Sequence, residues 1–310
     1  MNHNLKYNFL LMLAALIWGS AFVAQSVGMD YLGPFSFNCV RSFMGSLVLL
    51  PVIWFMDRQK KETAEHDGQK TEEGTREQNK KVLLSGGLCC GVILTLSTSL
   101  QQIGIKYTTA GKAGFITALY ILIVPLLGLI LGKKVGNKTW LGVALAVAGM
   151  YLLCIKEGFS LSRGDALVFI GSVLFTVHIL VIDHFSPKAD GVELSCIQFL
   201  TAGVISSVLA FVFEKPELSA LAEGIIPLAY AGILSSGVAY TLQVIGQRDT
   251  DPAVASLLLS MESVFSVLAG WMLLGQALSA RELMGCALVF GAVILVQLPT
   301  GKRRLDKKRA

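Results

Sequence analysis

The stretch Leu242–Gly275 reads LQVIGQRDTDPAVASLLLSMESVFSVLAGWMLLG, and its outline occurs twice in the chain. The segment LQQIG at 100–104 lies 142 positions before LQVIG at 242–246, and Leu131-Gly132 lies 143 positions before Leu274-Gly275. One acid, Glu262, interrupts the apolar run of the later copy, whereas the same neighbourhood of the earlier copy, 119–121, carries no charge. This spacing indicates that one hydrophobic module is used twice.

The composition of the chain points to lipid as its main solvent. Of its 310 residues, 54% are hydrophobic and 15% are charged, whereas a soluble domain has about 25% charged residues. So large an apolar excess cannot be hidden inside a soluble core. The formal net charge of +5 does not call for a nucleic-acid partner, because the basic residues gather beside the ends of apolar runs. We therefore predict an all-α integral membrane protein whose surroundings are the lipid bilayer.

A bilayer core needs about 20 apolar residues per helix, and backbone groups inside it must pair within the protein. Runs of this kind predict ten transmembrane helices: 9–29, 35–56, 82–105, 108–131, 139–155, 164–185, 193–213, 224–247, 252–275 and 280–298.

The distribution of Lys and Arg predicts the orientation of these helices. With the N-terminus inside, the inner segments hold 19 basic residues and the outer segments five. Both termini are therefore expected in the cytoplasm, in a multi-pass protein of the plasma membrane. The connection 57–81, with seven basic and seven acidic residues, is expected to be a solvated cytoplasmic linker. The tail 299–310 is expected to be a basic anchor against anionic headgroups.

The ten helices divide into two halves, 1–155 and 156–298, with five helices each. An odd number of helices means that the second half enters the membrane with the opposite orientation. Inverted repeats of this kind are typical of secondary transporters, in which the substrate site lies between the halves near the midplane. We therefore expect two inverted five-helix repeats and alternating access.

Several short motifs make the chain resemble the drug/metabolite transporter superfamily, ten-helix EamA type. Ile17-Trp18-Gly19-Ser20-Ala21-Phe22 is similar to the Trp-Gly-Ser-x-Phe motif of that family, and Pro34-Phe35 followed by Arg41 is similar to the opening of its second helix. Pro125, Leu131-Gly132 and Gly142 resemble the end of the EamA repeat.

The chain also departs from this pattern. Ser263 stands where the family often has Pro, and Lys133 and Gln276 stand where it usually has Glu. The resemblance implies a secondary carrier, commonly an exporter, of small organic metabolites such as amino acids or related compounds.

Three ionisable residues inside the predicted helices are candidates for substrate binding or coupling. Glu262 lies close to the middle of its helix, where it either faces a cavity as a proton acceptor or ties helices together. Arg41 either binds an anion or extends to the outer headgroups. His178 either relays protons, which would make protons the coupling ion, or makes one interhelical hydrogen bond.

Uncharged polar and aromatic residues extend the set of candidates. Glutamines recur at matched places of the third and eighth helices, where they line a cavity or join helices. Trp18 either walls the cavity or packs, and Lys112 begins the fourth helix near the outer surface. The further candidates are Gln101, Gln102, Gln243, Tyr240, Trp18 and Lys112.

Two other functional classes are weighed against transport. An intramembrane enzyme would need a nucleophile with its base or a metal site, and the sequence has no H-E-x-x-H or G-x-S-x-G motif. A non-transporting receptor or scaffold would need an ordered soluble domain, and 57–81 offers only a charged linker. We therefore expect a transporter and not an enzyme, with a small-molecule substrate and neither metal nor cofactor.

Overall fold

The computed structural model describes residues 3–67, 73–108, 110–154, 162–274 and 279–298. Within these ranges the chain forms helices joined by short turns, without strands. The first half contains α1 (His3–Gly28), α2 (Pro34–Asp67), α3 (Glu73–Ile105), α4 (Ala110–Ala118), α5 (Tyr120–Ile130) and α6 (Asn137–Cys154). The second half contains α7 (Arg163–Phe185), α8 (Gly191–Phe213), α9 (Leu218–Glu223), α10 (Ile225–Ala229), η1 (Tyr230–Tyr240), α11 (Thr241–Gln247), α12 (Pro252–Leu259), α13 (Glu262–Leu274) and α14 (Ala280–Gln297).

The described residues contain nine segments that are long and apolar enough to cross a membrane. These segments are Leu5–Gly28, Pro34–Gln59, Asn79–Ile105, Ala113–Ile130, Arg163–Phe185, Gly191–Phe213, Ile225–Gln247, Pro252–Ala269 and Ala280–Gln297. The fifth expected span, 139–155, coincides with α6, which is a helix of 18 residues but is not among the nine. The prediction of an all-helical membrane protein is confirmed for the described residues. Ten spans and cytoplasmic termini stay predictions.

The surface of the described helices is apolar while their interior holds polar side chains. Ile130, Phe211 and Met272 are 79%, 77% and 74% exposed, as expected for side chains that face lipid. Arg41 and Glu262, in contrast, are 4% and 3% exposed. Exposed apolar side chains together with buried charged ones match a bilayer as solvent.

Two expected spans are interrupted at matched places. The span expected at 108–131 divides into α4 and α5 at Leu119, and the span expected at 252–275 divides into α12 and α13 at Ser260 and Met261. At each break the backbone makes a tight i→i−3 hydrogen bond, from Leu119 N–H to the Ile116 carbonyl (3.2 Å) and from Met261 N–H to the Leu258 carbonyl (3.2 Å). Short 3₁₀ turns inside helices often mark hinges. Both segments are still long and apolar enough to cross a membrane, over Ala113–Ile130 and Pro252–Ala269, and each contains one such turn.

The span expected at 224–247 is also not one regular α-helix. It consists of α10, a π-helical segment η1 and α11, and η1 covers 11 residues from Tyr230 to Tyr240. Wider π-helical turns are uncommon and frequently occur at functional sites. Here η1 carries Ser235 and Tyr240 into the interior.

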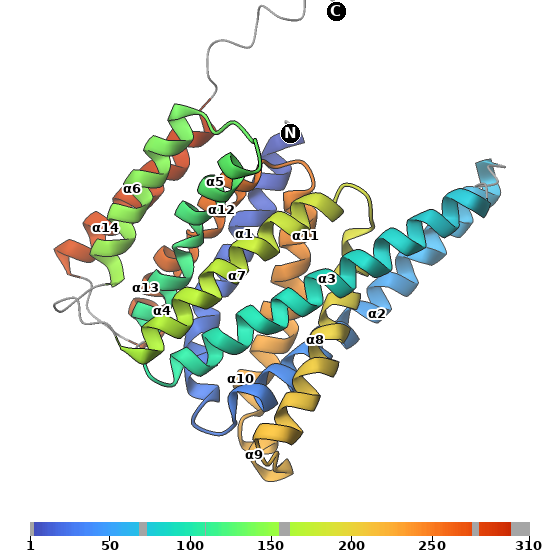
Figure 1. Cartoon of the computed structure of the whole chain (residues 1–310), viewed down its shortest axis with the longest axis horizontal. Helices are drawn as coiled ribbons and strands as arrows, with labels where there is room; N and C mark the ends of the chain where they lie inside the picture. Colours follow the sequence, from blue (N-terminus) through green and yellow to red (C-terminus); the bar gives the residue numbers. More distant parts are fainter. Residues whose placement is uncertain (1–2, 68–72, 109, 155–161, 275–278, 299–310) are drawn as a thin grey trace, which may run out of the picture.

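The charged connection 57–81 is largely a continuation of helices. α2 runs on to Asp67 and α3 begins at Glu73, so the two helices have 34 and 33 residues. At about 1.5 Å per residue each is longer than the roughly 30 Å of a bilayer core. Figure 1 shows them projecting past the other helices as a hairpin. Lys, Glu and Gln favour helix, and no Pro occurs in 57–81. This composition explains why the two helices extend into the charged connection.

The helices of the two halves interleave. α3 packs along α7 and α8, α2 packs along α8 and η1, and α6 pairs with α14. α1 lies against α13, α11 and η1. Where α6 meets α14, a Cβ atom on Gly149 would lie 2.7 Å from the Gly285 carbonyl oxygen, and one on Gly285 would lie 2.7 Å from the Gly149 carbonyl oxygen. Small residues of this kind let helix backbones approach closely in membranes.

The start of α2 is held by an acid from the other half of the chain. The carboxylate of Glu214 accepts hydrogen bonds from the Phe35 N–H (2.9 Å), the Ser36 N–H (2.8 Å) and the Ser36 hydroxyl (2.6 Å). An anion at a helix N-terminus satisfies free N–H groups and complements the helix dipole. Glu214 thereby fixes the start of α2 to the end of α8.

Candidate functional site

A cavity lies between the two halves and contains about 520 Å³ of empty space, its opening included. The first half lines it with Trp18, Phe22, Gln25, Arg41, Gln101, Thr117 and Tyr120. The second half lines it with Phe175, His178, Ile179, Ser235, Tyr240, Gln243, Leu259 and Glu262.

One face of α1 forms a wall of the cavity. Trp18, Phe22 and Gln25 follow one another at i, i+4 and i+7, which places them on one side of a helix. The indole N–H of Trp18 donates to the Ser235 carbonyl in η1 at 3.3 Å. Because Trp18 lines the cavity, its place agrees with the first of the two alternatives for it.

Of the three candidate glutamines predicted from the sequence, two line the cavity and one does not. The amide nitrogen of Gln101 donates to the Thr117 hydroxyl (2.9 Å), and the buried amide oxygen of Gln243 has no hydrogen-bond partner among the described residues. Gln102 is also buried but lies outside the cavity lining, where its amide nitrogen donates to the Gln25 carbonyl (3.1 Å). Of the two alternatives for Gln102, this position agrees with the second, because its side chain joins α3 to α1.

Glu262 meets Tyr120 at the junction of the two broken helices. Tyr120 begins α5 and Glu262 begins α13, and the tyrosine hydroxyl donates to Oε1 of the carboxylate at 2.9 Å. Both side chains are buried and both line the cavity. The helix breaks therefore bring an acid and a phenol together from opposite halves.

Arg41 lies in the same cavity but is bound to a neutral residue. Its Nη1 donates to Oε1 of Gln25 at 3.0 Å, and its guanidinium carbon is 5.9 Å from the centre of the Phe37 ring. Among the described residues no ion pair joins Arg41 to Glu262. Since Arg41 is only 4% exposed and lines the cavity, its position disfavours extension to the headgroups.

His178 and Tyr240 belong to an aromatic group beside the cavity. His178 Nε2 is hydrogen-bonded to Oε1 of Gln198 at 3.1 Å. The Tyr240 ring makes edge-to-face contacts with Trp18, His178 and Phe199 at centroid distances of 4.6, 6.0 and 5.3 Å. His178 thus makes an interhelical bond, as the simpler alternative predicts, and also borders the cavity.

Of the nine candidates, seven line the cavity: Glu262, Arg41, His178, Gln101, Gln243, Tyr240 and Trp18. Lys112 lies in α4, and its side chain is outside the described residues. The roles of all nine stay predictions. The described part of the chain holds no group of three or more His, Cys, Asp or Glu side chains placed to bind a metal ion.

Sequence reasoning did not nominate Tyr120, Gln25, Phe22 or Phe175. The sequence did contain a signal for such residues, because many lining residues come in pairs separated by one of two fixed spacings. Pairs 157 positions apart are Trp18 with Phe175 and Phe22 with Ile179, and pairs 142 positions apart are Gln101 with Gln243, Thr117 with Leu259, and Tyr120 with Glu262. The spacing decreases from 157 to 142 after the charged segment 57–81, because this segment lengthens only the first half.

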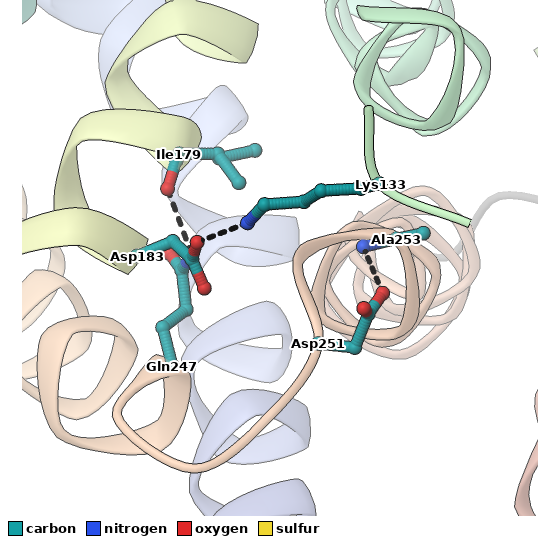
Figure 2. A network of polar contacts seen from close by, with 6 residues as sticks. All are labelled: Lys133, Ile179, Asp183, Gln247, Asp251 and Ala253. Carbon is teal, nitrogen blue, oxygen red and sulfur yellow. Dashed lines mark hydrogen bonds and ion pairs between the residues drawn. The ribbon is translucent and has the colours of Figure 1, made fainter. Parts of the chain in front are cut away.

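One ion pair joins the halves, and one hydrogen bond joins α7 to α11, near one end of the cavity (Figure 2). Lys133, after α5, forms an ion pair with Asp183 near the end of α7. The Gln247 amide donates to the Ile179 carbonyl at 3.0 Å. Since Ile179 lines the cavity and Asp183 follows one turn later on α7, the ion pair lies about one helical turn from the cavity lining.

The helices and the polar cavity between them define a multi-pass membrane protein built around an internal polar cavity. The EamA-like transporter family model matches the chain twice, at residues 5–155 and 162–298. The chain therefore belongs to the EamA-like transporter family, and the family resemblance predicted from its motifs is confirmed. The two matches begin 157 positions apart, the same spacing as Trp18 and Phe175.

Relatives and a solved structure agree with this assignment. The chain is 30% identical over 289 residues to a protein of Archaeoglobus fulgidus named an uncharacterized transporter, covering 93% of this chain and 84% of the relative. It is 24% identical over 292 residues to the uncharacterized inner membrane transporter YedA of Escherichia coli K12, covering 91% and 88%. A crystal structure with a TM-score of 0.73 and 17% identity covers 94% of this chain and 96% of its own, which indicates a shared fold.

Proposed function

We propose that the protein is a secondary transporter that exports a small organic metabolite, such as an amino acid or a related compound, across the plasma membrane. Transport would occur by alternating access between two inverted five-helix repeats. The observation that carries this proposal is the cavity between the halves, whose lining residues are paired at two constant spacings. A cavity on the axis that relates two inverted repeats can open to either side by the same rearrangement.

The helix contacts support an inverted repeat. Each helix of the first half can be exchanged for the helix in the same place of the second half. The contact of α3 with α7 then becomes the contacts of η1 and of α11 with α1, and all of these contacts occur. In the same way the contact of α4 with α7 becomes that of α12 with α1, and the contact of α5 with α7 becomes that of α13 with α1; all four occur. The pairs α2 with α8 and α6 with α14 exchange into themselves. Contacts that survive this exchange are those expected of a two-fold arrangement.

The paired helix breaks supply a mechanism for opening. Residues Leu119 and Met261 make the same tight backbone turn 142 positions apart, so each half has a hinge beside the cavity. The parts of each broken helix on either side of its hinge can tilt separately, and one tilt would open the cavity at one end only. The Lys133–Asp183 ion pair lies at one such end and would have to break when that end opens.

Glu262 is our candidate for coupling to protons. Among the described residues that line the cavity it is the one acid, and an ionisable group inside a membrane costs at least about 2.5 kcal/mol unless it is used or paired. Loss or gain of a proton on Glu262 changes both the charge of the cavity and the hydrogen bond from Tyr120. The bond joins the two hinges, so protonation and opening would be linked.

The test is transport by the purified protein in vesicles. Cells with and without the protein are first compared for metabolites in the medium, and compounds that differ are loaded into proteoliposomes. We expect release faster than from empty vesicles, and acceleration by an opposing proton gradient in the wild type but not in Glu262→Gln. Equal release rates from vesicles that contain the wild-type protein and from protein-free vesicles would refute transport. Equal proton dependence in wild type and variant would remove only Glu262.

A further inference from the structure

We infer that Arg41 binds the carboxylate of the transported substrate, so that the substrate is a small monocarboxylic acid or amino acid with an apolar body. This inference rests on the proposed transport function and adds the residue that recognises the acid group of the substrate. The starting observation is a permanent positive charge in the interior of a membrane protein. Arginine keeps its charge under all ordinary conditions, and a buried charge needs a counter-charge or several hydrogen bonds.

The described protein residues meet this need incompletely. Arg41 has five N–H donors. The hydrogen bonds among the described residues give it one acceptor, Oε1 of the neutral Gln25. Gln25 is itself fixed, because its backbone carbonyl accepts from Gln102. Arg41 is therefore a buried cation that lines the cavity and has donors left over.

The acid in the same cavity does not take this place. Glu262 accepts a hydrogen bond from Tyr120 and forms no ion pair with Arg41 within the described part of the chain. The residue 157 positions after Arg41 is Gln198, which is neutral and bonds to His178. The positive charge is thus confined to one half, and the framework of the repeat does not require it.

The number and shape of the charges favour a carboxylate over a phosphate. One guanidinium group can hold one carboxylate through two parallel hydrogen bonds. A phosphate monoester would bring close to two negative charges into a cavity whose described lining has one permanent cation and also holds Glu262. A neutral sugar lacks the charge that Arg41 calls for, and an amine without an acid would meet repulsion there.

The rest of the cavity suits the remainder of such a molecule. The buried amide oxygen of Gln243 has no partner within the described part of the protein and can accept a hydrogen bond from an amine or hydroxyl group. Trp18, Phe22, Phe175 and Tyr240 provide apolar and aromatic walls. A compound with one carboxylate, an optional donor and a hydrocarbon body complements these groups.

The experiment uses the full-length protein in lipid nanodiscs and matched probes. Phenylalanine, 3-phenylpropanoate and phenethylamine share one side chain but carry both charges, the acid alone or the amine alone; leucine, 4-methylpentanoate and 3-methylbutylamine form the aliphatic set. Inorganic phosphate is included as a separate anion. Binding is measured by ligand-induced thermal stabilisation. We expect acid-bearing members of at least one set to bind the wild type, and the matched amine and phosphate to bind at least 10-fold more weakly.

The variants test whether Arg41 is responsible. Arg41→Gln should weaken binding of the acid by about 10- to 100-fold, the range expected for a lost hydrogen bond to a charged group. Arg41→Lys should fall in between, because the charge stays but the fork is lost. Arg281→Gln is the matched control, since Arg281 lies over the Tyr151 ring, away from the cavity lining, and should leave binding unchanged.

Three results would overturn the inference: amines that bind the wild type as well as their acids, acids that bind Arg41→Gln with wild-type affinity, or no binding of any acid-bearing probe. The first and third need no variant, so a misfolded Arg41→Gln would not remove the test. Export of a neutral or cationic compound in the vesicle assay would overturn the role of Arg41 and keep the transport function. Acid binding that depends on Arg41, together with a lack of transport, would keep the role of Arg41 and overturn the transport function.

Discussion

Tyr120 and Glu262 are 142 positions apart in the chain, the same spacing as Gln101 and Gln243, and their side chains are hydrogen-bonded at 2.9 Å. Each begins the second part of a broken helix. Corresponding positions of two repeats can touch only where the axis that relates them passes. In the proposed inverted-repeat arrangement, the axis therefore passes through this hydrogen bond.

We expect Tyr120→Phe to lower the free energy of unfolding by about 1–3 kcal/mol, because the buried Glu262 carboxylate loses the hydroxyl that donates to it. In a Glu262→Leu background, which has no carboxylate to satisfy, the same change should cost at least about 1 kcal/mol less. Unfolding in one detergent measures all four proteins of the cycle. Tyr151→Phe, on the half-exposed Tyr151, is the control and should be nearly neutral. Equal costs of Tyr120→Phe in both backgrounds would contradict the coupling.

Gly149→Leu and Gly285→Leu should each destabilise the protein by more than about 2 kcal/mol and reduce its yield in membranes. Any side chain at these positions must push α6 from α14, because a Cβ atom alone would lie 2.7 Å from the opposing carbonyl oxygen. Gly291→Leu in α14 is the control, since a Cβ atom on Gly291 would have no described heavy atom of a neighbouring element within 4 Å. Thermal unfolding of the three variants checks this, and a Gly291 variant as unstable as the others would count against close packing.

Glu214→Ala should lower the free energy of unfolding by about 1–2 kcal/mol, the usual cost of losing a helix N-cap. The change removes the acceptor of three hydrogen bonds at the start of α2. Glu217→Ala is the matched control, because Glu217 precedes α9 without a side-chain capping bond. Denaturation of the two variants side by side is the measurement, and similar losses in both would argue against a capping role.

Lys133→Asp and Asp183→Lys should each change the transport rate several-fold while shifting stability by no more than about 1 kcal/mol, because partly exposed ion pairs contribute little to stability. The double exchange restores opposite charges and should return the rate toward wild type. Lys134→Asp, at an exposed neighbouring position, serves as the control. Vesicle transport rates decide the matter, and wild-type rates in both single variants would exclude a role for this contact in opening.

Much of the fold followed from the sequence because hydrophobic length is a strong signal in membranes. Spans such as 164–185 and 193–213 were predicted within two residues of α7 and α8. The repeat spacing of 142 also located Gln101 and Gln243 at the cavity. These patterns are readable because every helix that crosses the lipid bilayer needs a similar apolar length.

The interior geometry was beyond that signal. The breaks at Leu119 and Met261 and the π-helical turns of η1 lie in apolar runs that read as continuous helices. Neither Pro125 nor Pro252 marks the break in its own run, because the first lies six residues after Leu119 and the second begins α12. Gln25 also gave no sign of its bond to Arg41, since the partners come from different helices and packing alone brings them together.

The hairpin of α2 and α3, which projects past the other helices, offers a practical handle for structure determination (Figure 1). Small membrane proteins are difficult to align in electron microscopy because so little of them rises above the detergent or lipid. Two continuous helices that leave the bundle together form a stiff support, so a soluble helical domain joined in register between Asp67 and Glu73 would be held at a fixed angle. The unequal spacing of the repeats, 157 before this hairpin and 142 after it, indicates that the chain tolerates added length there without disturbing the cavity.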